Sequence, residues 1–159
     1  MEIRDATTQD ADAACEVLRQ SIVQLCDADH RNDPAILNRW LSNKKPAIVA
    51  GWATQPGNSL LVAVEAGAIL AVGSVTDAGE ITANYVAPAA RFRGVSRAML
   101  KALESRALER GNTECRLFST ETAHRFYQSA GYIDAGAPSE KFGTKSGHPM
   151  FKRLPGSLS

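Results

Sequence analysis

The amino-acid sequence has few cysteines, few aromatic side chains and no large excess of charge of either sign. It holds 3 cysteines and 6% aromatic residues, and its formal net charge is +1. Three cysteines cannot all pair within one chain, and Cys15, Cys26 and Cys115 lack the spacing of a metal site. We therefore expect reduced, buried thiols. The near-zero charge argues against a surface built throughout for nucleic acid or an anionic membrane.

Long apolar runs are also missing. The two longest, residues 60–64 and 66–72, fall well short of the ~20 residues that span a bilayer. The first residues, 1–5, are largely charged, and no apolar segment with a small-residue cleavage site follows them. We therefore expect neither a transmembrane helix nor a secretory signal, and a cytoplasmic location.

The composition that remains fits a globular protein. The chain has 159 residues, of which 44% are hydrophobic and 22% charged, and this predicts one domain, 1–159, with one core and a frayed tail at 156–159. Hydrophobic periodicity and turn residues then predict the elements. Strands are expected at 2–6, 60–65, 69–76, 80–87, 114–118, 132–135 and 149–154, and helices at 8–25, 34–43, 47–53, 95–110 and 120–130.

The most informative stretch runs from Tyr85 to Arg97, where a strand ends at Pro88 and a helix opens near Gly94. The free amides of a helix start carry the positive end of the dipole, and glycine allows close approach, so the stretch suits a pyrophosphate. A solvated arginine loop with Gly94 as a simple turn is the competing interpretation. A Walker loop and a dinucleotide fingerprint are both excluded, because their further glycines and lysine are absent.

Two motifs resemble a known family. Arg91-Phe92-Arg93-Gly94-Val95-Ser96 looks like the coenzyme A signature of the GNAT superfamily, Arg/Gln-x-x-Gly-x-Gly/Ala, with Ser96 at a position where the family prefers glycine or alanine. The segment 123–132 resembles the later Ala-x-x-Phe-Tyr-x-x-x-Gly-Tyr/Phe segment of the same family. The resemblance implies an acetyl-CoA-dependent N-acetyltransferase. Its α+β fold would have a mixed sheet with the strands in sequence order, the element order β-α-α-β-β-β-α-β-α-β-β, and a splayed cleft between the fourth and fifth strands.

The resemblance also implies a set of site residues. The pantetheine would lie along 84–87, and the pyrophosphate on the amides of 93–97. The expected cofactor-binding residues are Tyr85, Val86, Ala87, Arg91, Phe92, Arg93, Gly94, Val95, Ser96 and Arg97. Glu80 falls where several members carry a general base, and Tyr127 falls on the motif tyrosine that assists the leaving thiolate. The alternative for Glu80 is a surface glutamate at the start of a strand, and the alternative for Tyr127 is a tyrosine of the core.

Acceptor-side residues are harder to assign from the sequence. Glu80, Thr82 and Asn84 share one face of an ideal strand, opposite Ile81 and Tyr85, and three polar residues in a row indicate a cavity or solvent. Asn84 is therefore a candidate substrate-binding residue. The acidic run that includes Asp29 and His30 would attract a cationic amine, with a plain polar loop as the alternative.

The predicted activity is transfer of an acetyl group from acetyl-CoA to a primary amine, with no metal. A non-catalytic acyl-CoA-binding regulatory module is the first alternative. The second is an RNA-binding domain that uses Arg91, Arg93, Arg97 and Lys101, against which the net charge argues. The sequence leaves open the amine acceptor, the acyl chain preference and the oligomeric state, a homodimer included.

Overall fold

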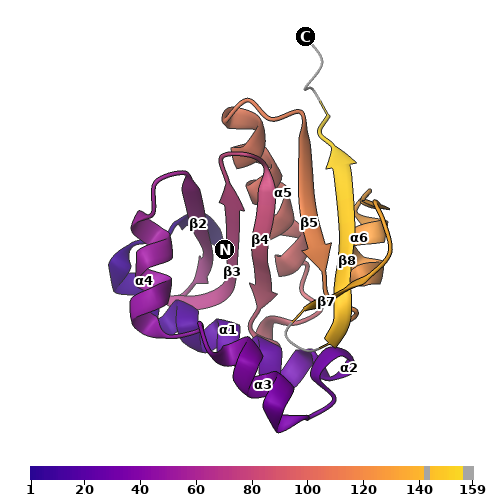
Figure 1. Ribbon diagram of the computed structural model, residues 1–159. Helices are drawn as coiled ribbons and strands as arrows, with labels where there is room; N and C mark the ends of the chain where they lie inside the picture. Colours follow the sequence, from indigo (N-terminus) through magenta and orange to yellow (C-terminus); the bar gives the residue numbers. More distant parts are fainter. Residues whose placement is uncertain (142–143, 156–159) are drawn as a thin grey trace.

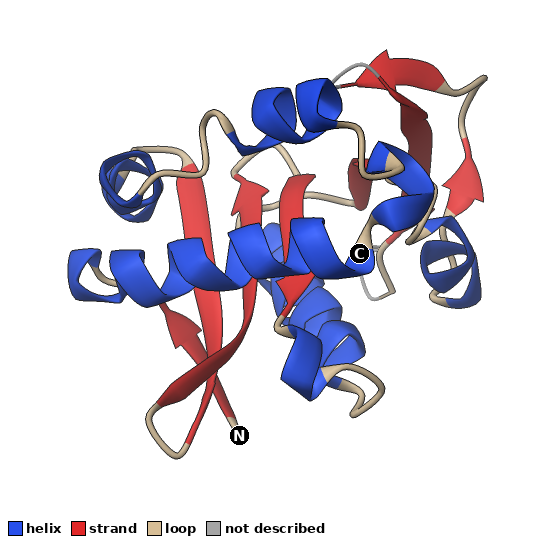
Figure 2. Cartoon of the chain, turned by 90° about the horizontal axis from the view of Figure 1, so that it is seen from below, coloured by secondary structure: helices blue, strands red, loops and turns tan. Residues whose placement is uncertain are grey.

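The computed structural model describes residues 1–141 and 144–155, so the predicted frayed tail lies outside the described residues. Within these ranges the chain forms a twisted sheet with helices on both sides (Figures 1 and 2). The elements are β1 (Glu2–Asp5), α1 (Ala11–Leu25), α2 (Asp27–His30), α3 (Pro34–Leu41), α4 (Pro46–Thr54), β2 (Asn58–Glu65), β3 (Ala68–Thr76), β4 (Glu80–Val86), α5 (Val95–Glu109), β5 (Glu114–Ser119), α6 (His124–Ser129), β6 (Ile133–Asp134), β7 (Ser139–Lys141) and β8 (Thr144–Arg153).

Local sequence signals account for most of these elements. The predicted start of α3 is confirmed, because Asp33 Oδ1 accepts hydrogen bonds from the amides of Ala35 at 2.9 Å and Ile36 at 3.4 Å. The predicted helix over 120–130 is wrong at its beginning, since α6 starts only at His124. The last strand is longer than predicted and begins at Thr144.

The sheet follows the order β1-β2-β3-β4-β5-β8-β6, with β7 paired to β8. The prediction that the strands follow sequence order is therefore wrong, because β8 lies between β5 and β6. Among the strands of residues 1–141 and 144–155, β4 and β5 alone are parallel neighbours, and their pairing is limited to Glu80 with Arg116 and Ile81 with Leu117. Beyond these two pairs the strands separate, which confirms the predicted splay between the fourth and fifth strands.

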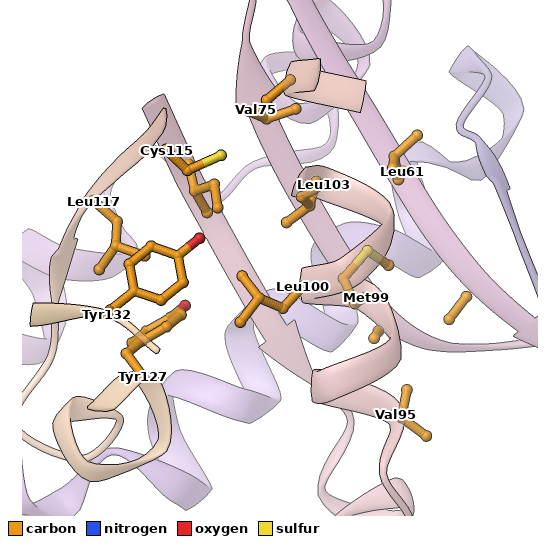
Figure 3. Packing of buried hydrophobic residues seen from close by; sticks show 14 of the residues in the cluster. Leu61, Val75, Val95, Met99, Leu100, Leu103, Cys115, Leu117, Tyr127 and Tyr132 are labelled. Carbon is orange, nitrogen blue, oxygen red and sulfur yellow. The ribbon is translucent and has the colours of Figure 1, made fainter. Parts of the chain in front are cut away.

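The sheet divides the predicted single core into separate clusters. On one face Met99, Leu100 and Leu103 of α5 pack with strand residues and with the two tyrosines shown in Figure 3. On the other face α1 and α4 cover the sheet, and Figure 1 shows α4 in front of the strands and α5 behind them. The close approach of α5 needs Gly73, because a Cβ there would lie 2.7 Å from the sulfur of Met99. Because helices cover both faces of the sheet, a ligand can reach its strands only where β4 and β5 separate.

A bulge in β4 changes which side chains share a face. Val75 pairs with Ile81 and Ser74 with Ala83, so Thr82 is the extra residue of the bulge and has no residue of β3 opposite it in the strand register. Ile81 consequently packs in the α5 core, while Tyr85 packs against α1. The prediction that Ile81 and Tyr85 share a face is wrong, because one extra residue in a strand shifts the alternation of side chains.

Candidate active site

The predicted phosphate loop leads directly into α5. Gly94 is the residue before the helix and has φ 77°, a left-handed conformation that glycine adopts without strain. Among the described side chains none caps the first amides of α5, so the N–H groups of residues 95–97 point outward. A Cβ at Gly94 would have no atom within 4 Å. The loop therefore presents free donors next to open space.

The arginines of this loop all lie on the surface. The guanidinium of Arg91 lies 4.5 Å from the ring centroid of Phe92, which is 89% exposed. Arg93 forms an ion pair with Glu65 at 2.8 Å, and Arg97 donates to Ser129 Oγ at 2.9 Å. Such exposed pairs contribute little to stability, so these guanidinium groups are available to an anionic ligand.

A cavity of about 490 Å³, here called the arginine cavity, extends from this loop toward the splayed strands. Its lining includes eight of the predicted cofactor- and substrate-binding residues: Asn84, Tyr85, Val86, Arg91, Phe92, Gly94, Ser96 and Arg97. Tyr127 completes it from α6. Three predicted cofactor residues do not line it: Val95 is buried in the core, Arg93 pairs with Glu65, and Ala87 donates its amide to Leu70.

Tyr127 lies where this cavity meets the strands. Its side chain is buried, and its ring packs edge-on against Tyr132 with the centroids 5.6 Å apart (Figure 3). Burial raises the pKa of Tyr127 to about 12, although a hydrogen bond with the Asn84 side chain opposes the rise. The phenol therefore keeps its proton near neutral pH and can donate it.

Asn84 offers the opposite function, a buried acceptor. The interaction of its side chain with Tyr127 does not involve the Oδ1 atom, which is buried and has no hydrogen-bond partner among the described residues. A buried polar atom without a partner costs free energy unless water or a ligand supplies a donor. Because Asn84 lines the arginine cavity, its oxygen fits an amide N–H of a bound ligand.

A second cavity of about 390 Å³, the tryptophan cavity, is lined by Trp40, Trp52 and Lys44 and by Thr82 of the bulge. A small opening of about 60 Å³ lies between β4 and β5. It shares Thr82 and Phe118 with the tryptophan cavity, and Asn84 and Tyr127 with the arginine cavity. The splayed strands thus connect two cavities, an arrangement that lets two ligands meet.

Sequence reasoning missed the tryptophan cavity. The sequence predicted a helix over 34–43, in which Trp40 is one apolar residue among several and after which Lys44 follows. Neither residue carries a motif that would have signalled a cavity. The only local signal was the unusual concentration of tryptophan and lysine between 40 and 52.

Glu80 lies at the beginning of β4, half-buried, and lines none of the three cavities. Its backbone N–H donates to Thr76 Oγ1 at 3.1 Å. Thr76 and Thr82 both line the tryptophan cavity, so the glutamate stands one residue outside it. Because Glu80 does not line the cavity, we expect its carboxylate to act on a ligand there through water.

The predicted substrate-binding pair, Asp29 and His30, is buried and has partners within the protein. Asp29 accepts hydrogen bonds from the amides of Glu121 at 2.7 Å and Thr122 at 3.2 Å, and from the Thr122 hydroxyl. His30 contacts the carbonyl of Ile22 at 3.0 Å. The expectation that this acidic run attracts a cationic amine does not fit these positions, because the Asp29 carboxylate accepts hydrogen bonds from the turn before α6.

We expect Asp29→Ala to lower the free energy of unfolding by about 2 kcal/mol or more, because it leaves several donors near α6 without their charged acceptor. Denaturant unfolding measures the change. Asp27→Ala, at an exposed position of the same short helix, is the control and should change stability by less than about 0.5 kcal/mol. A wild-type stability in Asp29→Ala would contradict the structural assignment.

The family follows from comparison with known proteins. A family model described as an acetyltransferase (GNAT) domain matches residues 31–154, well over half of the chain. The protein therefore belongs to the GNAT acetyltransferase family, and its enzymatic class is acetyltransferase. Comparison with curated proteins by sequence finds no match. Among the described residues, none of the helices has the length and apolar content that a membrane crossing requires.

Solved structures with the same fold cover nearly the whole chain. A GCN5-related N-acetyltransferase from Rhodopseudomonas palustris, also named "Aminotransferase, Class-II", has a TM-score of 0.85 at 23% identity, with 96% of this chain and 95% of that chain covered. PaiA N-acetyltransferase from Thermoplasma acidophilum, in complex with coenzyme A, has a TM-score of 0.81 at 17% identity, with 96% of this chain and 98% of that chain covered. YncA, a putative acetyltransferase from Salmonella typhimurium solved with acetyl-CoA, has a TM-score of 0.71 at 21% identity, with 97% of this chain and 94% of that chain covered.

Proposed function

We propose that the protein transfers an acetyl group from acetyl-CoA to a primary amine that attacks the thioester directly. The observation that carries this proposal is the position of Tyr127, a neutral phenol at the opening where the arginine and tryptophan cavities meet. Two structurally similar proteins are complexes with coenzyme A or acetyl-CoA, which supports the choice of donor.

The arginine cavity fits the donor. The free amides of 95–97 and the guanidinium groups of Arg91 and Arg97 suit a pyrophosphate. Asn84 Oδ1, buried without a partner among the described residues, suits an amide N–H of the pantetheine. Acetyl-CoA supplies an acyl group activated as a thioester. The residues of this cavity would place that group at the opening between β4 and β5.

The backbone of β4 supplies an oxyanion donor. The amide of Ala87 donates to Leu70 of β3 at 2.7 Å. Because neighbouring N–H groups along a strand point to opposite edges, the Val86 N–H points away from β3 and toward the splay. We assign this amide to the developing negative charge on the carbonyl oxygen.

Two side chains then move protons. Tyr127 donates to the departing sulfur, which makes the thiol a better leaving group. Glu80 takes the proton of the attacking amine through water, since its carboxylate stands outside the cavity. Both roles are part of the proposal.

The direct test is a thiol-release assay with acetyl-CoA and a panel of amines: free amino acids, polyamines, aminoglycosides and peptides. Amine-dependent release of coenzyme A above the hydrolysis rate is the expected result. Binding of acetyl-CoA without turnover of any amine would instead support the non-catalytic binding module.

For Glu80 we expect Glu80→Gln to lower kcat/KM for the amine most below pH ~8, where an amine of pKa ~10.4 is nearly all protonated and needs a base. Higher pH should partly restore the rate. Glu114→Gln, half-buried at the beginning of β5, is the matched control and should leave the pH profile unchanged. A loss in Glu80→Gln that is equal at every pH would show that Glu80 is not the base.

A further inference from the structure

Phe92 is an aromatic side chain exposed to solvent beside the arginine cavity. Its exposed fraction is 89%, whereas the next most exposed large hydrophobic side chain among the described residues, Ile133, has 57%. A ring exposed to this degree gains little from packing against its own protein. Phe92 nevertheless lines the arginine cavity together with Gly94 and Ser96. Its ring is therefore available to a ligand of that cavity.

The backbone of Phe92 has a conformation that disfavours a bulky side chain. Its φ of 65° lies in the left-handed region, where a residue with a Cβ is strained. The other described non-glycine residues in this region follow a helix or form a tight hairpin: Arg31 and Asn32 come directly after α2, and Ala66 lies between β2 and β3. Phe92 lies instead in the loop before α5. Strain of this kind is frequent where a loop binds a ligand.

Arg91 lies against one face of the Phe92 ring. Its guanidinium is 4.5 Å from the ring centroid, a cation–π contact, and the high exposure of Phe92 leaves the opposite face open. In the same cavity the free amides of 95–97 and the guanidinium of Arg97 suit phosphate groups. A ligand that combines phosphates with a flat aromatic ring, as a nucleotide does, therefore matches this end of the cavity better than a purely apolar ligand.

We infer that Phe92 binds the nucleotide end of the donor, with the adenine base stacked on the open face of its ring. The inference rests on the proposed function, which puts the thioester at the opening between β4 and β5 and the pyrophosphate at the beginning of α5. The nucleoside follows the pyrophosphate at the end away from the thioester, so it would leave the cavity beside the loop that carries Phe92. Phe92 would thereby favour donors with a nucleotide over pantetheine thioesters that lack one.

The test compares coenzyme A with phosphopantetheine, which lacks the nucleotide part, by calorimetric titration into the full protein. Phe92→Asn removes the ring and keeps a residue that tolerates the left-handed conformation. We expect it to lower the affinity for coenzyme A by about 10-fold, the effect of one lost base stack, and to leave the affinity for phosphopantetheine unchanged. Phe92→Tyr keeps the ring and should keep both affinities. Ile133→Asn, at an exposed residue outside the three cavities, is the control and should change neither.

Three results would overturn the inference: wild-type affinity for coenzyme A in Phe92→Asn, an equal loss for both ligands, or a loss in Phe92→Tyr as large as in Phe92→Asn. The comparison of these two variants needs only coenzyme A, so it decides even if phosphopantetheine binds too weakly to measure. Transfer is measured separately by thiol release. Wild-type affinity in Phe92→Asn together with amine-dependent release would contradict the adenine site alone. Affinity that depends on the ring, without transfer to any amine, would contradict the proposed function alone.

Discussion

Replacing Tyr127 by phenylalanine should lower kcat by about 100-fold or more while leaving the affinity for acetyl-CoA near that of the wild type, the usual effect of removing a positioned proton donor. Phenylalanine keeps the ring, which packs against Phe126 and Tyr132 with centroids 5.2 and 5.6 Å away. The substitution therefore removes the hydroxyl group and its hydrogen bond with Asn84, and little of the packing. Steady-state kinetics under conditions where chemistry limits the rate give the measurement.

Tyr132→Phe is the matched control. Tyr132 is equally buried and its ring contacts Tyr127, but its hydroxyl donates to Glu104 at 2.8 Å and it lines none of the three cavities. Tyr132→Phe should reduce stability by about 1 kcal/mol without lowering kcat. An activated thioester should also reduce the deficit of Tyr127→Phe. If Tyr127→Phe keeps the kcat of the wild type, Tyr127 is not the proton donor and contributes only to the packing of the core.

The pH dependence of kcat gives an independent test of Tyr127 as the proton donor. Burial raises the pKa of Tyr127 to about 12, so the phenol stays protonated until the pH approaches that value. A proton donor of this kind loses its function only as pH rises through the raised pKa. Any decline of kcat on the alkaline side well below pH ~11 must therefore come from another group.

Gly94→Glu should abolish the stabilisation of the protein by acetyl-CoA. At 100 times Kd a ligand stabilises the native state by about 2.7 kcal/mol, which in a domain of this size raises the melting temperature by roughly 5–10 °C. A glutamate would place bulk and negative charge in the open space before α5, where the pyrophosphate is proposed to bind. Thermal unfolding with and without acetyl-CoA measures the shift.

Gly94→Ala separates this effect from backbone strain. Any residue with a Cβ is strained at φ 77°, at a cost of about 1 kcal/mol, so both variants should melt below the wild type without ligand. Alanine adds only a methyl group to a space with no atom within 4 Å, and its ligand-induced shift should largely persist. If a folded Gly94→Glu protein keeps the wild-type shift, this loop does not bind the phosphates.

Features governed by neighbouring residues could be predicted from the sequence. The cap at the beginning of α3 involves only Asp33 and the next three residues, up to Ile36. The loop that leads to Gly94 and α5 is likewise one continuous stretch that begins near Tyr85. The splay between β4 and β5 was expected from the resemblance of two motifs. Each of these signals lies within a short stretch of chain, where sequence determines conformation directly.

Features governed by distant residues could not be predicted. The bulge at Thr82 depends on how β4 registers with β3, and the insertion of β8 between β5 and β6 joins segments far apart in the chain. Asp29 accepts a hydrogen bond from Glu121, which lies 92 positions further along the chain. The sequence near Asp29 does not show this partner, so its charge alone suggested a role in binding a cationic amine. The tryptophan cavity likewise forms only when α3, α4 and the sheet are assembled.

The short pairing between β4 and β5 also creates two strand edges inside the molecule, which differ from the outer edges of a sheet in their access to other chains. Past Ile81 and Leu117 each of these strands has an edge of unpaired backbone groups, as the outermost strand of any sheet does. Exposed edges of that kind invite pairing with another chain and promote aggregation. Here the edges lie in the middle of the molecule, between two helical layers and beneath the walls of two cavities. A slender ligand can reach them, but the strand of another protein, with side chains on both faces, cannot.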